Sequence, residues 1–175
     1  MANTADNVFV GVTGVVYYGE STTTLPTALN DALTEFTDVG YINEDGITET
    51  QGTESNDVKA WQNGDVVRVI QTSHSLTYQF TMLETSDNVQ TLFYGGAPAA
   101  ATPLEIDGSE PDRRTFVIVA LDGTKKRLIA IPDGQITERG DVVLNSDGPA
   151  EYSVTITCYP DSSGVKAYVY EGTAA

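Results

Sequence analysis

Apolar and polar side chains alternate one by one along two segments of the chain, residues 75–83 and 150–159. A period of two is typical of a strand with one packed face and one wet face. The side chains predicted to face a core are Leu76, Tyr78, Phe80, Met82, Tyr152, Val154, Ile156 and Cys158. The side chains predicted to face water are Thr77, Gln79, Thr81, Ser153, Thr155 and Thr157.

A predicted hairpin lies between these two strands. Residues 115–121 and 127–131 are mostly apolar and flank the turn sequence Asp122–Gly123–Thr124–Lys125. Apolar runs on both sides of an Asp-Gly turn favour a hairpin, and their apolar character on both faces makes it the most buried part of the predicted sheet. Residues 72–75 are interpreted as another hairpin tip. Further strands are predicted at residues 8–18, 66–72, 135–144 and 165–170.

Turn signals recur as five Asp-Gly pairs, beginning at residues 45, 107, 122, 133 and 147, and as Asn63–Gly64. Both residues of such a pair tolerate the positive φ that two-residue hairpin turns require. The first pair lies in Asn43–Thr48, a stretch that resembles a calcium loop. Aligned on Gly46, however, Tyr41 and Gly52 occupy the positions of a ligand aspartate and of the bidentate glutamate. The stretch is therefore predicted to be a turn, with Ile47 returning to the core.

A short helix is predicted over residues 86–94. Ser86 is a suitable N-cap, and Gly95 can end the helix in the left-handed conformation. The side chains that would share its packed face are Val89, Leu92 and Phe93. A weaker helical pattern covers residues 27–36, with an apolar side formed by Leu29, Leu33 and Phe36.

The length of 175 residues fits a single domain with extended arms. The predicted domain spans residues 1–175, with an N-terminal arm (1–7), a long loop (50–63) and a short C-terminal tail (171–175). The loop over 50–63 is mostly polar but carries Trp61. Loops of this length in compact domains are usually functional. A second loop, residues 95–103, is rich in Gly, Ala and Pro.

The net charge of -16 argues against tight binding to nucleic acid, because the protein's field repels phosphate. The charge is also uneven. Ten Asp and Glu precede Lys59, the first basic residue, whereas five of the nine basic residues fall between Arg113 and Arg127. The two ends of the folded unit are therefore expected to differ in electrostatic potential.

Catalytic and metal-binding chemistry has little support. With Cys158 as its single cysteine and His74 as its single histidine, the chain cannot form an internal disulfide or a His-based metal cluster. No phosphate-binding glycine motif is present. We therefore predict no catalytic residues, no cofactor and no metal. No apolar run is long enough for a signal peptide or a membrane span, so a soluble protein made in the cytoplasm is expected.

Two other functions remain open from the residues. Trp61 and the nine tyrosines could form a sugar-stacking surface, as in a carbohydrate-binding or adhesin β-sandwich module, although Tyr78 and Tyr152 fall on predicted core faces. The many carboxylates also allow an acid pair of the glycosidase type, but no spacing selects a pair. The first alternative predicts a monomer with an exposed aromatic strip, and the second predicts a cleft with perturbed acids.

The order of four segments gives the chain a resemblance to a known family. They are Phe36–Thr48, the turn Lys59–Gly64, the strand pair from Val66 to Glu84 and the short helix ending in Leu92–Gly96. Continued through the later hairpin and the C-terminal strands, this order resembles the major tail tube protein of long-tailed, non-contractile phages. The resemblance covers most of the chain and depends on segment order, since no single motif is diagnostic.

The resemblance implies a mainly β fold, a β-sandwich or barrel of the tail tube type with one flanking short α-helix. It implies six-fold rings that stack into a hollow tube, with strands of each subunit in a continuous barrel around the lumen. DNA and the tape measure protein would pass through this lumen, without specific binding of the DNA. Tail-tip and tail-terminator proteins would be further partners, and the protein, made in the host cytoplasm, would reside in the virion tail. Related folds occur in contractile tails and in type VI secretion.

The residues agree with this implied assembly in three respects. A net charge of -16 suits a conduit that DNA must leave freely. The wet strand faces, carrying Thr77, Gln79, Thr81, Ser153, Thr155 and Thr157, are candidates to line the lumen. Trp61 is a candidate to contact a neighbouring subunit, because buried aromatics supply much interface energy. Its alternative role is a cap on the domain's own core.

Stacking of rings is heterologous, since the top of one ring meets the bottom of the next. The uneven charge therefore predicts contacts between a basic cluster and the acidic N-terminal third of a neighbouring subunit. The basic candidates are Arg113, Arg114, Lys125, Lys126 and Arg127. The acidic candidates are Glu44, Asp45 and Glu49. The alternative for the basic residues is a solvated hairpin tip.

Overall fold

A computed structural model describes residues 7–146 and 148–174 of the chain. The protein is mainly β with a short helix, which confirms the predicted fold class. The elements are β1 (Thr13–Glu20), β2 (Thr37–Asp38), β3 (Ile42–Lys59), β4 (Val66–Met82), α1 (Asp87–Tyr94), β5 (Arg114–Asp122), β6 (Lys125–Arg139), β7 (Tyr152–Tyr159) and β8 (Tyr168–Thr173). The predicted N-terminal arm, residues 1–7, lies outside the described residues except for its last position.

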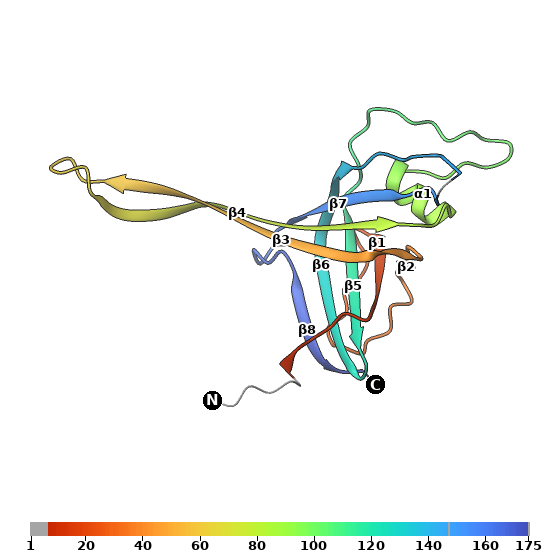
Figure 1. Cartoon of the computed structure of the whole chain (residues 1–175), viewed down its shortest axis with the longest axis horizontal. Coiled ribbons are helices and arrows are strands. Elements are labelled where there is room, and N and C mark those ends of the chain that lie inside the picture. Colours follow the sequence, from red (N-terminus) through yellow and green to blue (C-terminus); the bar gives the residue numbers. More distant parts are fainter. Residues whose placement is uncertain (1–6, 147, 175) are drawn as a thin grey trace.

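Antiparallel pairing joins the strands in the order β2-β1-β5-β6-β7-β4-β3, with β8 paired to β6 off this path. The first half of β6 pairs with β8 and its second half pairs with β7. In Figure 1, β3, β4 and β7 run across the view, whereas β1, β5 and β8 run down it. The sheet therefore bends at β6 and folds over its own apolar face. The pairing of β8 also makes a strand of residues 171–173, which were predicted to be part of a C-terminal tail.

The main core fills the inside of this bend. All eight side chains that alternation predicted to face a core are buried, so that prediction is confirmed. The core also takes side chains from the hairpin of β5 and β6, and its largest fully buried members include Tyr78, Phe80, Met82, Phe116, Ile131 and Ile156. Cys158 belongs to it, and burial raises the pKa of its thiol to about 12.

The predicted helix is confirmed as α1. The hydroxyl of Ser86 accepts a hydrogen bond from the backbone N–H of Val89, and Gly95 ends the helix with φ of 92°. The buried face of α1 consists of Val89, Leu92 and Phe93, as predicted. The Phe93 ring meets the Tyr152 ring edge to face with centroids 5.2 Å apart, which fixes α1 against β7.

The other predicted helix, over residues 27–36, does not form. The Asp31 carboxylate accepts hydrogen bonds from the backbone N–H groups of Thr27 and Ala28, and such bonds compete with helical pairing. The same bonds lower the pKa of Asp31. The segment instead lies over the outer face of β5 and β6. The residues that pack there around Val117, Val119, Leu128 and Ala130 include Leu25, Leu29, Leu33 and Phe36. Both faces of this hairpin are thus covered, as its apolar sequence predicted.

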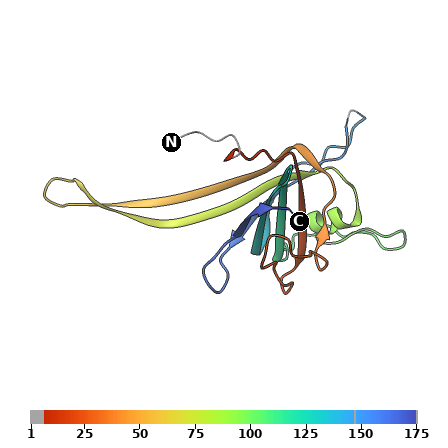
Figure 2. The ribbon, with the colours of Figure 1, turned by 90° about the horizontal axis from the view of Figure 1, so that it is seen from below.

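Residues 50–63 do not form the predicted loop. Residues 50–59 continue β3, which pairs with β4 as far as Lys59 and Val66, and the turn lies at residues 60–65. Because β7 pairs with β4 only between Thr77 and Met82, the rest of β3 and β4 is a two-stranded ribbon, here called the arm. Figures 1 and 2 show the arm projecting far from the body of the molecule. The predicted hairpin tip at residues 72–75 is also wrong, since His74 lies within β4.

The Asp-Gly pairs have different outcomes. Asp122–Gly123 forms the turn between β5 and β6, and Asn63–Gly64 lies in the tip of the arm; both glycines have positive φ. The turn predicted over Asn43–Thr48 is wrong, because these residues lie in β3 at a shift in its register with β4. Gly46 has φ of 70° there, and Ile47 packs against the core as predicted. The pair that begins at residue 147 falls partly outside the described residues.

Asp133–Gly134 lies inside β6 rather than in a turn. A Cβ atom on Gly134 would come within 2.7 Å of the Phe116 ring and 3.0 Å of Ile156. Glycine is needed here for close packing of three strands at the bend, because any side chain would displace the core.

We expect Gly134→Ala to destabilise the protein by about 1–3 kcal/mol, the usual cost of overpacking a core. The free energy of unfolding, measured by urea titration, tests this. Gly108→Ala is the matched control, since a Cβ there meets nothing within 4 Å, and its unfolding should change little. Equal stability of the two variants would contradict the packing role of Gly134.

Candidate functional site

The six polar residues predicted to line a channel lie together on one face of the sheet. They form three directly opposed cross-strand pairs between β4 and β7, which are Thr77 with Thr157, Gln79 with Thr155 and Thr81 with Ser153. Directly opposed side chains point to the same side of a sheet. This polar face is therefore the reverse of the core face.

The polar face extends beyond the predicted residues onto β6. The Thr155 hydroxyl donates to the Glu138 carboxylate at 3.3 Å, and the hydroxyls of Thr137 and Thr157 lie 2.7 Å apart. The sequence reasoning missed Thr137 and Glu138. Their signal was the alternation around Ile136, but the supposed turn at Asp133–Gly134 concealed that this strand is continuous with the hairpin before it.

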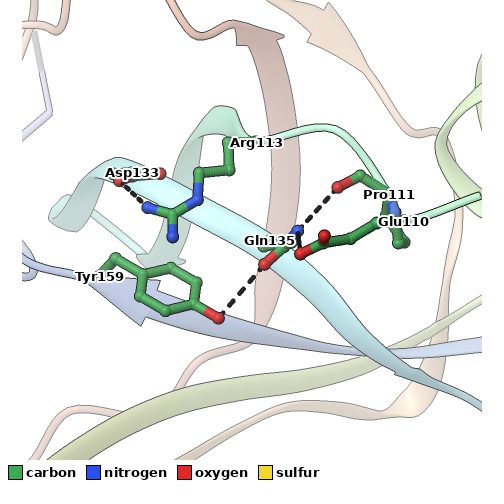
Figure 3. Close-up of polar contacts among 6 residues, drawn as sticks. All are labelled: Glu110, Pro111, Arg113, Asp133, Gln135 and Tyr159. Atoms are coloured by element: carbon green, nitrogen blue, oxygen red, sulfur yellow. Dashed lines mark hydrogen bonds and ion pairs between the residues drawn. The ribbon is translucent and has the colours of Figure 1, made fainter.

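One end of the polar face is closed by the segment that leads into β5 (Figure 3). Gln135, only 6% exposed, donates to the Glu110 carboxylate and to the Pro111 carbonyl, and it accepts from the Tyr159 hydroxyl. Arg113 forms an ion pair of 2.6 Å with Asp133, and its guanidinium lies over the Tyr159 ring. These contacts fix the end of the long connection between α1 and β5 onto β6 and β7.

The arm exposes apolar side chains that no other part of the described chain covers. Trp61, at the tip, is 98% exposed, so a role as cap on the domain's own core is wrong. The other exposed apolar residues near the tip are Val58, Val66, Val67, Val69 and Ile70. At the base of the arm, the Lys166 ammonium donates to the His74 carbonyl, which joins the loop between β7 and β8 to the arm. The apolar run from Val66 to Ile70 was the available signal for this surface.

The predicted basic cluster is divided between the two ends of the β5–β6 hairpin. Arg113 and Arg114 lie at the start of β5, whereas Lys125, Lys126 and Arg127 lie beyond the turn at its other end. At roughly 3.3 Å per residue, the nine residues of β5 separate these groups by about 25–30 Å. Arg114 forms an ion pair with Glu20, and Arg127 forms one with Glu171. The prediction that these five residues form one basic cluster is therefore wrong.

Arg127 lies instead in a groove with the three predicted acidic contacts of its own subunit. The groove, of about 910 Å³, opens between the first part of β3 and the first part of β1, and its lining includes Glu44, Asp45 and Glu49. Glu49 accepts a hydrogen bond of 2.9 Å from the Tyr78 hydroxyl. Burial, and then this bond, raise the pKa of Tyr78. The groove thus joins a floor of core side chains to an acidic rim.

No three His, Cys, Asp or Glu side chains in residues 7–146 and 148–174 are grouped so that they could hold a metal ion. Over the same residues, no helix has the length and apolar character needed to span a membrane.

Comparison with known proteins identifies the family. A family model described as phage tail tube protein matches residues 1–171. No curated protein sequence matches the chain. The solved structures that are similar include the SPP1 tail tube, with 9% identity, a TM-score of 0.51 and coverage of 94% of this chain and 80% of that chain. At 9% identity, this likeness shows a shared fold and nothing further.

Two further similar structures have lower TM-scores. The tail of an empty GTA particle has 13% identity, a TM-score of 0.47 and coverage of 99% of this chain and 100% of that chain. The cap of the anti-feeding prophage has 9% identity, a TM-score of 0.48 and coverage of 98% and 100%. The family match, which spans almost the whole sequence, decides the assignment: the chain belongs to the phage tail tube protein family and is a structural component of the phage tail.

Proposed function

We propose that this protein forms six-fold rings that stack into the tube of a phage tail, a conduit for DNA ejection into the host. The family assignment supports the role in a tube. The arm is the structural observation that supports association between subunits. An exposed two-stranded ribbon with apolar side chains near its tip needs a partner surface, because large exposed apolar patches mark interaction sites. The six-fold ring is what the family resemblance implies.

The polar face of β4 and β7 is the surface proposed to line the lumen. Its hydroxyl and amide groups hydrogen-bond water and carry no positive charge that would hold phosphate. The net charge of -16 supports passage of DNA without specific binding. The tape measure protein would pass through the same lumen. Tail-tip and tail-terminator proteins would bind the two ends of the tube. The tube protein itself would be made in the host cytoplasm.

The contacts between subunits are proposed to use both the arm and charged residues. Trp61 belongs to the arm, and Glu44, Asp45 and Glu49 belong to the groove. Lys125 and Lys126, at the turn of β5 and β6, are proposed to face an acidic surface of a neighbouring subunit. Arg113, Arg114 and Arg127 are assigned to ion pairs within their own subunit, since each has an acidic partner there.

A carbohydrate-binding role is not favoured. Stacking on a sugar needs aromatic rings that form one platform, but the exposed Trp61 and Tyr41 lie at opposite ends of β3. Its 18 residues separate them by about 60 Å.

Negative-stain electron microscopy at rising protein concentration, beside the mass in solution, tests the assembly. We expect rings or hollow tubes to replace a monomer of 18.7 kDa, and we expect more protein to be needed at high salt, because salt screens the charged contacts. A monomer that persists at every concentration, with and without tail-tip proteins, would contradict the proposal.

Gln79→Lys tests which face lines the lumen. Gln79 is exposed and directly opposes Thr155, so each ring would gain six inward cations if the polar face lines the tube. We expect assembled Gln79→Lys to retain short linear duplex DNA at low salt, whereas the wild type should not. A covalently closed DNA circle has no end and cannot enter a tube, so it should not be retained.

The matched control places lysine on a loop outside the polar face. Leu144→Lys changes a residue that is 84% exposed between β6 and β7. If this variant binds DNA, it should treat linear and circular molecules alike. Retention of the circle by Gln79→Lys would show that the polar face lies on the outside of the tube.

A further inference from the structure

The groove between β1 and β3 has the chemistry of a receptor for an apolar segment with positive charge. Ile47, Ile118 and Ile129 contribute to its floor. The carboxylates in its lining are those of Asp38, Glu44, Asp45, Glu49 and Glu84. Its volume of about 910 Å³ is at the upper end of the range for small-molecule sites, about 300–1,000 Å³, so it has room for a large aromatic side chain with its neighbours.

The distal end of the arm has the complementary chemistry. Trp61 projects into solvent at the tip, and Val66 and Val67 follow directly on β4. Lys59 and Arg68 are the only basic residues in the first 112 positions of the chain, and both lie beside the tip. They place one cation on each side of the exposed tryptophan, within a part of the sequence whose other charged residues are acidic.

A subunit cannot place its own arm tip in its own groove. The first part of β3 forms one wall of the groove, and the same strand runs outward to the tip. The ten residues that follow Glu49, ending at Lys59, carry the chain about 33 Å away from that wall. Both views show the arm directed away from the body (Figures 1 and 2). Any contact between an arm tip and this groove therefore joins two subunits.

We propose that the arm tip of one subunit, anchored by Trp61, inserts into the β1–β3 groove of another, with Lys59 and Arg68 facing the carboxylates of its rim. This inference rests on the proposed function and names the surface that the arm contacts. The contact is heterologous, because each subunit offers one arm and one groove, and such contacts form closed rings or extended stacks. The aromatic anchor supplies affinity, and the charges steer the approach.

The fluorescence of Trp61 reports this contact directly, since it is the single tryptophan of the chain. The side chain is 98% exposed in the subunit, and its emission shifts to shorter wavelength when it leaves water. We expect this shift to accompany assembly of the wild type. Trp61→Ala should raise the concentration needed for half-assembly about thirtyfold, as for loss of a hot-spot side chain. Leu144→Ala, which removes another exposed apolar side chain, is the control and should assemble normally.

A mixing experiment separates the two halves of the contact. Trp61→Ala keeps an intact groove but has no tryptophan. Glu44→Lys with Asp45→Lys reverses the groove rim at two exposed positions but keeps Trp61. Circular dichroism checks that both variants are folded. Neither variant alone should assemble at the wild-type concentration. Their mixture should show the emission shift together with complexes that contain both variants.

The outcomes distinguish this contact from the tube itself. Rings or tubes that form without an emission shift, or that Trp61→Ala forms as readily as the wild type, would overturn the arm-and-groove contact and leave the tube function intact. Absence of a shift in the mixture, when the wild type shows one, would place Trp61 in another site and would also overturn it. A wild type that shows neither assembly nor a shift would count against both proposals.

Discussion

Pairing of β6 with three other strands is the constraint on which the fold depends. β5 runs along one edge of β6, while β8 and β7 share the other edge in succession. Strands β7 and β8 leave β6 in different directions, so the sheet has to bend where the partner changes. That change occurs around Pro132 to Gly134, where β5 also shifts its register and where a glycine lets Phe116 approach the backbone.

The bend gives the two faces of the sheet different roles. Folding brings β4 and β7 opposite β5, and their apolar faces meet in one core. The reverse side of β4 and β7 is then free to carry polar residues, and their direct opposition in three pairs makes that face continuous. The reverse side of β5 and β6 is covered by residues that connect β1 to β2. One sheet thus provides the core, an outer face of β5 and β6 that is covered by a loop, and a solvent-exposed polar face on β4 and β7.

The periodic pattern of apolar and polar residues predicted the parts of the fold whose structure is determined by burial of side chains. The core faces of β4 and β7 and the capped helix α1 were predicted because burial imposes a period on their side chains. Of the arm, only the strand over residues 66–72 was predicted. Residues 50–59 were predicted to be a loop, because neither face of the arm is buried within the subunit and no period distinguishes them from a loop. The turn predicted at Asp133–Gly134 was wrong for a related reason. The sequence shows a turn-forming pair, but tertiary packing uses the missing side chain rather than the flexible backbone. The groove joins residues from β1, β3 and β6, and strand patterns alone do not reveal such proximity.

The arm and the net charge impose opposite demands on assembly. A two-stranded ribbon is marginally stable in water by itself, and this one also exposes six large apolar side chains near its tip. Contact with another subunit would bury them and would favour association. Every subunit, however, carries a net charge of -16, so like charges repel as subunits approach. Association therefore needs local attraction where surfaces meet, and the acidic first 112 residues place their two cations beside the apolar tip. The same arrangement leaves the rest of the protein negative, which is what a tube that must release DNA requires.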